Sequence, residues 1–350
     1  WLGLFFIFLL IIPFLADAYI LYIVNLIGFA IIGAIGLNLL TGFTGQISLG
    51  HAAFVGVGGY TTAVLITKLN FSFWLALPFA GLVAASAGLI IGIPSLRVKG
   101  LYLCMATLAA QFIFEFIFIH WESMTHGIRG INVPAPSIFG FALNTEKRFY
   151  YLTLVVVILA VIFARNLVRS RVGRAFVAIR DRDLAAEIIG ISLFRYKLTA
   201  FAISSFYAGV AGALWVSFMR IVTPDHFPFH LSIQYLAMVI VGGLGSVLGS
   251  IFGAVFMIVT PELLNVLSST LNETIPGMGQ LFIPMKEVVF GGLIVLFQKD
   301  DPISLPQAGG IDIDLDLPLQ SSGEVARGHD LQLLHLVLYV GLCDIVEVMG

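Results

Sequence analysis

The chain has 350 residues, of which 59% are hydrophobic and only 11% are charged, and its formal net charge is −2. Soluble domains carry about 25% charged residues, so this composition and a mean hydropathy of +1.02 indicate a polytopic membrane protein. Nucleic-acid binding is not expected, because no basic patch with interleaved aromatic residues occurs outside residues 165–197. We predict an all-α membrane protein with about ten transmembrane crossings, some of them broken or glycine-rich.

The N-terminal stretch, residues 1–15, is apolar, begins at Trp1 without a methionine and lacks a basic flank. We interpret it as a truncated first span, with a signal peptide as the alternative. Residues 19–40 are the next predicted span, since about 20 apolar residues cross a bilayer core. Cys104 and Cys343 fit no disulfide framework and no metal-site spacing, so we expect them to be packing residues.

Residues 41–65 would make a poor lipid-facing helix, because six glycines and several polar residues interrupt the apolar run. Broken backbone at membrane depth survives only where protein or a water-filled cavity surrounds it. A half-helix after such a break can offer unpaired amides and positive dipole character to an anionic group. We hypothesise that the break at residues 42–50 lies on a solute pathway lined by Thr44, Gln46, Ser48 and His51. The alternative is that the glycines serve helix packing and the polar side chains bond neighbouring backbones.

Three further spans are predicted at residues 73–93, 100–119 and 149–164. Arg97 and Lys99 place the link between the first two on the cytoplasmic side. The polar, proline-bearing connection 121–148 should then lie outside, where it could touch a partner. Gln111 and Glu115 share one helical face, and a carboxylate within a span is a functional candidate by default. A snorkelling or inter-helix role for Glu115 is equally open, since it lies near the external end.

Residues 165–197 form the only long, strongly basic segment. It has eight basic and three acidic residues, a local net charge of +5, and cannot sit in lipid. With apolar runs on both sides, it is predicted to be a cytoplasmic loop that orients the whole chain.

Within this loop the sequence predicts one short helix, with Asp183 as its N-cap and Gly190 as its stop signal. Fewer than two turns, residues 184–189, are marginal alone and need a surface to dock on. The alternative is a solvated loop whose charges only orient the protein. The candidate docking residues are Asp183, Leu184, Ala185, Ala186, Glu187 and Gly190.

The remaining spans are predicted at residues 198–219, at 236–260 with a second span or half-span that runs on to about residue 268, and at 282–297. Small residues in the first of them, including Ser204 and Ala208, should allow tight helix contact. Gly245, Gly249 and Gly253 recur every four residues, which permits a close backbone crossing. Both termini are then expected to be cytoplasmic.

We divide the chain into a transmembrane domain, residues 1–298, and an acidic C-terminal tail, residues 299–350. Nine acidic residues follow Phe297 but only two basic ones, Lys299 and Arg327. An added module, a frame-shifted end and disorder are all open for the tail, and its residues indicate no function.

Three stretches carry a resemblance to a known family. They are AAEIIGI within the basic loop, GLNLLTGFTGQISLGHAAFVGVGGY at residues 36–60, and SLRVKGLYLCMATLA at residues 95–109. Together they resemble the permeases of ABC importers, specifically the branched-chain amino acid permease family, over about residues 18–298. In the usual loop of ABC permeases an acidic residue precedes the two alanines, whereas here Leu184 holds that place and Glu187 follows them.

This resemblance implies a permease of the bacterial inner membrane that moves branched-chain or related amino acids inward. It implies four kinds of partner: two ATP-binding-cassette ATPase subunits, a second related permease, a periplasmic solute-binding protein and membrane lipid. Relatives in the family carry urea and short amides, so these solutes are the alternative. The resemblance implies no cofactor.

Two other classes of function compete with a permease, a self-contained channel or ion-coupled carrier and an intramembrane enzyme. The sequence has no G-x-x-x-x-G-K-[ST] phosphate loop, and it contains neither H-E-x-x-H nor G-x-S-x-G. A carrier would be expected to show paired carboxylates within its spans, and only Glu115 is available. We therefore expect a transport permease that is not itself an enzyme and depends on separate ATPases.

Overall fold

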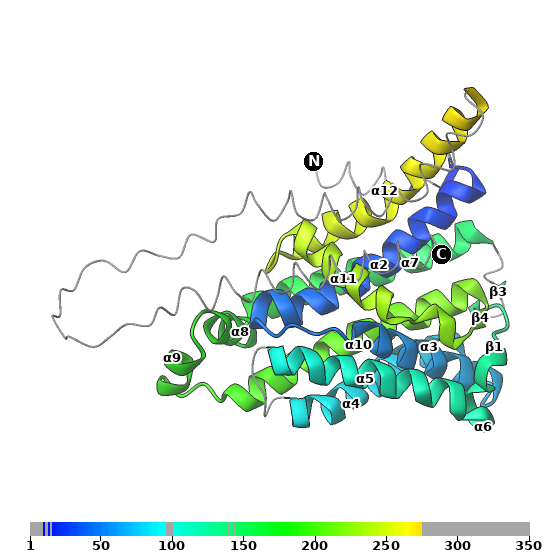
Figure 1. Cartoon of the computed structure of the whole chain (residues 1–350). Coiled ribbons are helices and arrows are strands. Elements are labelled where there is room, and N and C mark those ends of the chain that lie inside the picture. The colour runs from blue at the N-terminus through cyan, green and yellow to red at the C-terminus, as the bar shows by residue number, and fades with distance from the viewer. Residues whose placement is uncertain are drawn as a thin grey trace, which may run out of the picture. The chain divides into compact units, whose positions relative to one another are not determined.

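The computed structural model describes residues 10, 13–14, 16–95, 101–138, 141–142 and 145–274. These residues are mostly helical (Figure 1). The longer helices are α2 (Ala18–Thr44), α3 (His51–Thr67), α4 (Phe73–Ser95), α5 (Leu101–His120), α7 (Glu146–Arg169), α8 (Arg171–Asp181), α10 (Leu193–Met219), α11 (Phe229–Gly242) and α12 (Val247–Thr274). The short ones are α6 (Glu122–Thr125), α9 (Asp183–Ile188), and the 3-10 turns η1 (Gly127–Arg129) and η2 (Pro224–His226).

Six helices in the described ranges are long and apolar enough to cross a membrane, namely α2, α4, α5, α7, α10 and α12. The all-α, multi-span prediction is therefore confirmed, but the count of about ten crossings is not. The span predicted at residues 282–297, the tail and most of residues 1–15 lie outside the described residues.

The chain divides into two compact units, Trp1–Val259 and Thr260–Gly350. The first contains every described element up to the first half of α12. Of the second unit, the structure describes the rest of α12, which ends at Thr274.

Helix α10 is central to the first unit and packs against α2, α3 and α4. Its small residues make these crossings close, because a Cβ on Gly212 would lie 1.9 Å from the carbonyl oxygen of Val55. A Cβ on Gly58 of α3 would likewise lie 2.3 Å from Cα of Gly209. Small residues are what allow membrane helices to approach backbone to backbone, and the predicted small residues Ser204 and Ala208 are buried here.

The span predicted at residues 236–260 is instead two helices. Helix α11 ends at Gly242, a turn occupies residues 243–246, and α12 begins at Val247. Gly243 and Gly245 take φ angles of +100° and +79°, a backbone conformation that interrupts an α-helix. The predicted close crossing holds for the other two glycines, because Gly249 and Gly253 of α12 pack on the backbone of α11.

Within the described ranges, two antiparallel pairs of very short strands lie outside the helices. Strand β1 (Ile131–Asn132) pairs with β4 (Ile221–Val222), and β2 (Ser137–Ile138) pairs with β3 (Phe141–Ala142). The first pair joins the α5–α7 connection to the α10–α11 connection. Lys68, just after α3, donates to the carbonyl oxygen of Ser123 in α6. These loops therefore share one end of the unit, and α8 and α9 lie at the other (Figure 1).

Candidate functional site

The basic segment is more helical than its charge suggests. It was predicted to be one loop with a single short helix, but it contains α8 and α9, and both α7 and α10 extend into it. Ser170 is the N-cap of α8, and its hydroxyl accepts hydrogen bonds from the amides of Val172 (3.1 Å) and Gly173 (3.4 Å). Its buried residues Ala175, Phe176 and Ile179 face the rest of the unit. An amphipathic helix therefore carries the charges at this end.

The predicted short helix is present as α9, Asp183–Ile188, one residue earlier at its start than expected. Asp183 is the first helical residue rather than the cap, and its Oδ1 accepts the amide of Leu184 at 2.9 Å. Gly190, with a φ of +88°, follows the helix as the stop that was predicted. Its amide donates to the carbonyl oxygen of Glu187 at 2.9 Å.

Helix α9 presents apolar side chains outward. Leu184 is 67% exposed, Ile188 86% and the following Ile189 74%, whereas Ala186 is only 2% exposed. Of the six residues predicted to dock on a partner, Ala186 thus faces the chain itself, and Leu184, Ala185, Glu187 and Gly190 are exposed. The sequence reasoning missed Ile188, the last residue of α9, and Ile189, which follows it.

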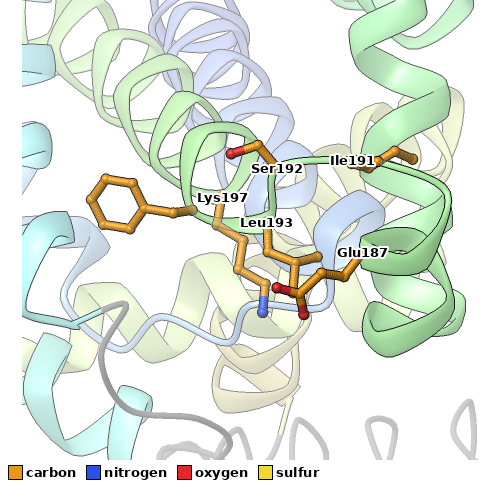
Figure 2. Close-up of a pocket in the computed structure, with 7 residues that line it drawn as sticks. Glu187, Ile191, Ser192, Leu193 and Lys197 are labelled. Atoms are coloured by element: carbon orange, nitrogen blue, oxygen red, sulfur yellow. The ribbon is translucent and has the colours of Figure 1, made fainter.

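A pocket of about 440 Å³ opens beside α9, where the chain turns into α10. It is lined by Glu187, Gly190, Ile191, Ser192, Leu193, Phe194 and Lys197. Figure 2 shows the side chains of Glu187 and Lys197 extending toward the same space, from α9 and from the first turns of α10. The exposed face of α9 and this pocket, called the docking surface below, together offer apolar contact and both signs of charge.

The predicted break is also present, between α2 and α3. Thr44 is the last residue of α2, residues 45–50 are not helical, and His51 is the first residue of α3. This non-helical segment leads from the end of α2 beside α8 back to the start of α3 (Figure 1). Thr44, Gln46, Ser48 and His51 are all at most 3% exposed. The structure therefore brings the four predicted pathway residues into one buried stretch.

Three of these four residues, Thr44, Gln46 and His51, bond neighbours within the protein. Gln46 Nε2 donates to Thr44 Oγ1 at 2.8 Å. His51 Nε2 donates to the carbonyl oxygen of Gly33 at 3.0 Å, and the His51 ring packs edge-on against Tyr235. By contrast, Gln46 Oε1 and Ser48 Oγ are buried with no hydrogen-bond partner within the described part of the chain. These two atoms could bind a polar solute.

The amides around the start of α3 are paired, contrary to the expectation of unpaired amides. Leu49 donates to Thr107 Oγ1 at 3.0 Å, Ala52 to Ser232 Oγ at 2.8 Å, and Ala53 to Gln111 Oε1 at 2.8 Å. Side chains of α5 and α11 thus cap this half-helix. Gln111 also donates to the carbonyl oxygen of Phe227 at 2.9 Å, so it holds two segments at once. Thr107 and Ser232 have no local sequence signal that could have identified them.

Residues 19–298 match the family model described as the permease component of the branched-chain amino acid transport system. The chain belongs to this permease family. It is 34% identical to the high-affinity branched-chain amino acid transport system permease protein LivM of Escherichia coli K12 over 276 residues, which cover 72% of this chain and 65% of LivM. It is 34% identical to LivM of Salmonella typhimurium LT2 over 258 residues, 67% of this chain and 61% of that protein.

A second branch of the permease family is more distant. LivH of Salmonella typhimurium LT2 is 27% identical over 235 residues, which cover 61% of this chain and 74% of LivH. The chain thus spans somewhat less than two thirds of the length of the LivM relatives. No solved structure matches the chain.

Proposed function

We propose that this chain is a permease subunit of an ABC importer, and that it moves branched-chain or related amino acids inward. The energy comes from ATP hydrolysed by two separate ATPase subunits, so the chain itself is not an enzyme. A second related permease completes the membrane channel, and a periplasmic binding protein delivers the solute. One observation carries the proposal: in a member of this permease family, the short helix α9 holds Leu184, Ile188 and Ile189 outward beside a pocket.

Helix α9 has neither buried large apolar side chains nor the length to be stable by itself, and both features favour docking on a partner. Fully burying an aliphatic side chain stabilises by roughly 1.5–3 kcal/mol, and α9 together with the following Ile189 leaves three such side chains exposed. A six-residue helix cannot hold its shape by backbone hydrogen bonds alone. A partner that covered the docking surface would therefore both bury these side chains and stabilise the helix.

We also propose an orientation for the chain in a bacterial inner membrane, based on its basic segment. The basic segment would face the cytoplasm with the docking surface, and the end that carries β1 and β4 would face the periplasm. We place both termini on the cytoplasmic side. Cysteine labelling in intact cells should modify Pro134→Cys with an impermeant reagent and leave Arg174→Cys unmodified, because both positions are exposed but lie at opposite ends. The reverse pattern would exclude this orientation.

The solute class follows from the break and from the relatives. Thr44, Gln46 and Ser48 are neutral hydrogen-bonding groups, which suit a zwitterion better than a charged lining would. The names of the LivM and LivH relatives specify branched-chain amino acids. Neutral groups would also bind urea or short amides, and this is the alternative solute class.

The deciding experiment uses the co-expressed transport complex in proteoliposomes. Ile188→Glu should release the ATPase subunits and abolish ATP-dependent leucine uptake, because a carboxylate cannot enter an apolar interface without desolvation. Ile128→Glu is the matched control, since Ile128 is 72% exposed but lies in η1 at the other end. It should retain the ATPase subunits. Retention of the ATPase subunits by Ile188→Glu would refute the docking role of α9.

The same preparation separates the solute classes. Unlabelled leucine, isoleucine and valine should each compete with labelled leucine, whereas urea and acetamide should not. Competition by the amides without competition by the amino acids would assign the permease to the alternative class.

A further inference from the structure

Arg180, on the last turn of α8, lies in a notch formed by three glycines. Its Nη1 donates to the carbonyl oxygen of Gly42 at 2.9 Å. A Cβ on Gly45 would lie 3.3 Å from Arg180 Cγ, and a Cβ on Gly245 would lie 2.7 Å from Arg180 Nη1. The side chain therefore passes close to the backbone of two segments, the C-terminal end of α2 and the turn between α11 and α12, and a larger residue at position 245 would displace the guanidinium group.

The first element that Arg180 contacts is the C-terminal end of α2. Carbonyl groups in the last turn of a helix lack intrahelical partners and form the negative end of the helix dipole. The carbonyls of Leu40 and Thr41 accept the amides of Gln46 and Gly45. Arg180 supplies a charged donor to the next carbonyl, that of Gly42. It thus caps α2 directly before the break.

The second element is the turn between α11 and α12. Asn38 of α2 holds this turn, since its Oδ1 accepts the amide of Gly245 at 2.9 Å. Its Nδ2 donates to the carbonyl oxygen of Ser246 at 2.8 Å and to Ser250 Oγ at 2.6 Å. Both interruptions of the membrane helices, at residues 45–50 and 243–246, therefore meet at the Arg180 notch.

The third element is α8 itself, which leads within a few residues into α9. A shift of α9 on a partner would move α8, and the guanidinium of Arg180 would move relative to Gly42 and Gly245. We propose that Arg180 is a positioning residue that couples the docking surface to the two helix interruptions, an inference that rests on the proposed function. Arginine suits this role because its planar fork can donate to a backbone carbonyl while it packs between glycines. The salt bridge from its Nε to Asp181 Oδ1, at 3.3 Å, is solvent-exposed and contributes little.

The first test measures the number of leucine molecules transported per ATP hydrolysed by the co-expressed complex in proteoliposomes. Arg180→Gln should lower this ratio about tenfold, the effect of losing one hydrogen bond to a charged group. Gly245→Ala should lower it similarly, because its Cβ would occupy the place of Nη1, and the ratio of Arg180→Lys should fall between those of Arg180→Gln and the unaltered protein.

The control is Arg174→Gln, which removes the same charge from an exposed position of α8 and should leave the ratio unchanged. An unchanged ratio in Arg180→Gln would overturn the proposal, whatever the absolute rates, because a purely structural defect lowers both rates together. If Arg180→Gln fails to assemble, Arg180→Lys is judged by the same criterion.

The second test needs no transport and so separates this inference from the proposed function. Buried Cys104 of α5 contacts the carbonyl oxygen of Ile47, inside the break, at 3.6 Å. If Arg180 holds the break in place, Arg180→Gln should speed the alkylation of Cys104 several-fold, as located by peptide mass spectrometry, while Arg174→Gln should not. Equal alkylation rates in the two variants would refute the link between Arg180 and the break, even in a complex that transports normally.

Discussion

Helix α9 and the break at residues 45–50 are of similar length, and both are rich in small residues, but they are stabilised in opposite ways. Helix α9 exposes its large apolar side chains, and Ala186 is its one buried residue. The break buries polar side chains, and other helices bond the amides around it. The comparison teaches that the chain itself satisfies the polar groups around the break, whereas it leaves the apolar side chains of α9 exposed, and the proposed partner would cover them.

The largest expected effect comes from replacing a glycine with valine, at Gly50 in the break and at Gly190 just after α9. A Cβ on Gly50 would lie 2.3 Å from the carbonyl oxygen of Thr107, so Gly50→Val forces α3 away from α5. We expect it to destabilise the protein by on the order of 3 kcal/mol. A Cβ on Gly190 would meet no atom within 4 Å, so Gly190→Val strains only its own left-handed backbone, by about 1–2 kcal/mol. Thermal unfolding in detergent measures the stability of both variants, and equal losses of stability would contradict the difference between the two segments.

A smaller effect is expected from removing one of the caps of α3. Gln111→Leu leaves the amide of Ala53 and the carbonyl of Phe227 without their partner, which should cost about 2 kcal/mol. Glu115→Gln is the control on the same helix, since Glu115 is only half-buried. It should unfold within a degree or two of the unaltered protein, by the same thermal measurement. A Gln111→Leu protein as stable as this control would show that the break does not depend on its caps.

The smallest change in stability should come from the two atoms without partners. Ser48→Ala removes a hydroxyl that bonds nothing described in the protein, so the free energy of unfolding should change by less than about 0.5 kcal/mol. Gln46→Leu should cost about 1 kcal/mol, through the lost bond to Thr44. Leucine uptake should nevertheless fall several-fold in both variants, while stimulation of the ATPase by loaded binding protein persists. Unchanged uptake would assign both residues to packing.

The sequence predicted the features of the fold that depend on local composition. Long apolar runs located five of the six spans to within a few residues at most ends, and glycine density located the break. The motif around Ala185 and Ala186 located α9. These features were predictable because each is a property of neighbouring residues, namely the hydrophobic length of a span and the start and stop signals of a helix.

The features that were missed depend on contacts between distant parts of the chain. Thr107 caps an amide 58 residues away and Ser232 one 180 residues away, and neither side chain differs from an ordinary packing residue in the sequence. Helix α8 was not predicted, because charged residues dominate its composition. The turn at residues 243–246 was read as helix because Gly245 keeps the four-residue spacing of Gly249 and Gly253. The hydrogen bonds to Asn38 instead hold these residues as a turn.

The Asn38 bonds also set an order of assembly during synthesis. Asn38 and Ser250 are 212 residues apart in the chain, so at about 5–20 residues per second the ribosome needs roughly 10–40 s to supply the partner. Throughout this interval the buried amide of α2 has to be hydrated near the membrane surface. The C-terminal end of α2 therefore settles only when α12 arrives, and a nascent chain that stops earlier would expose this end to membrane proteases.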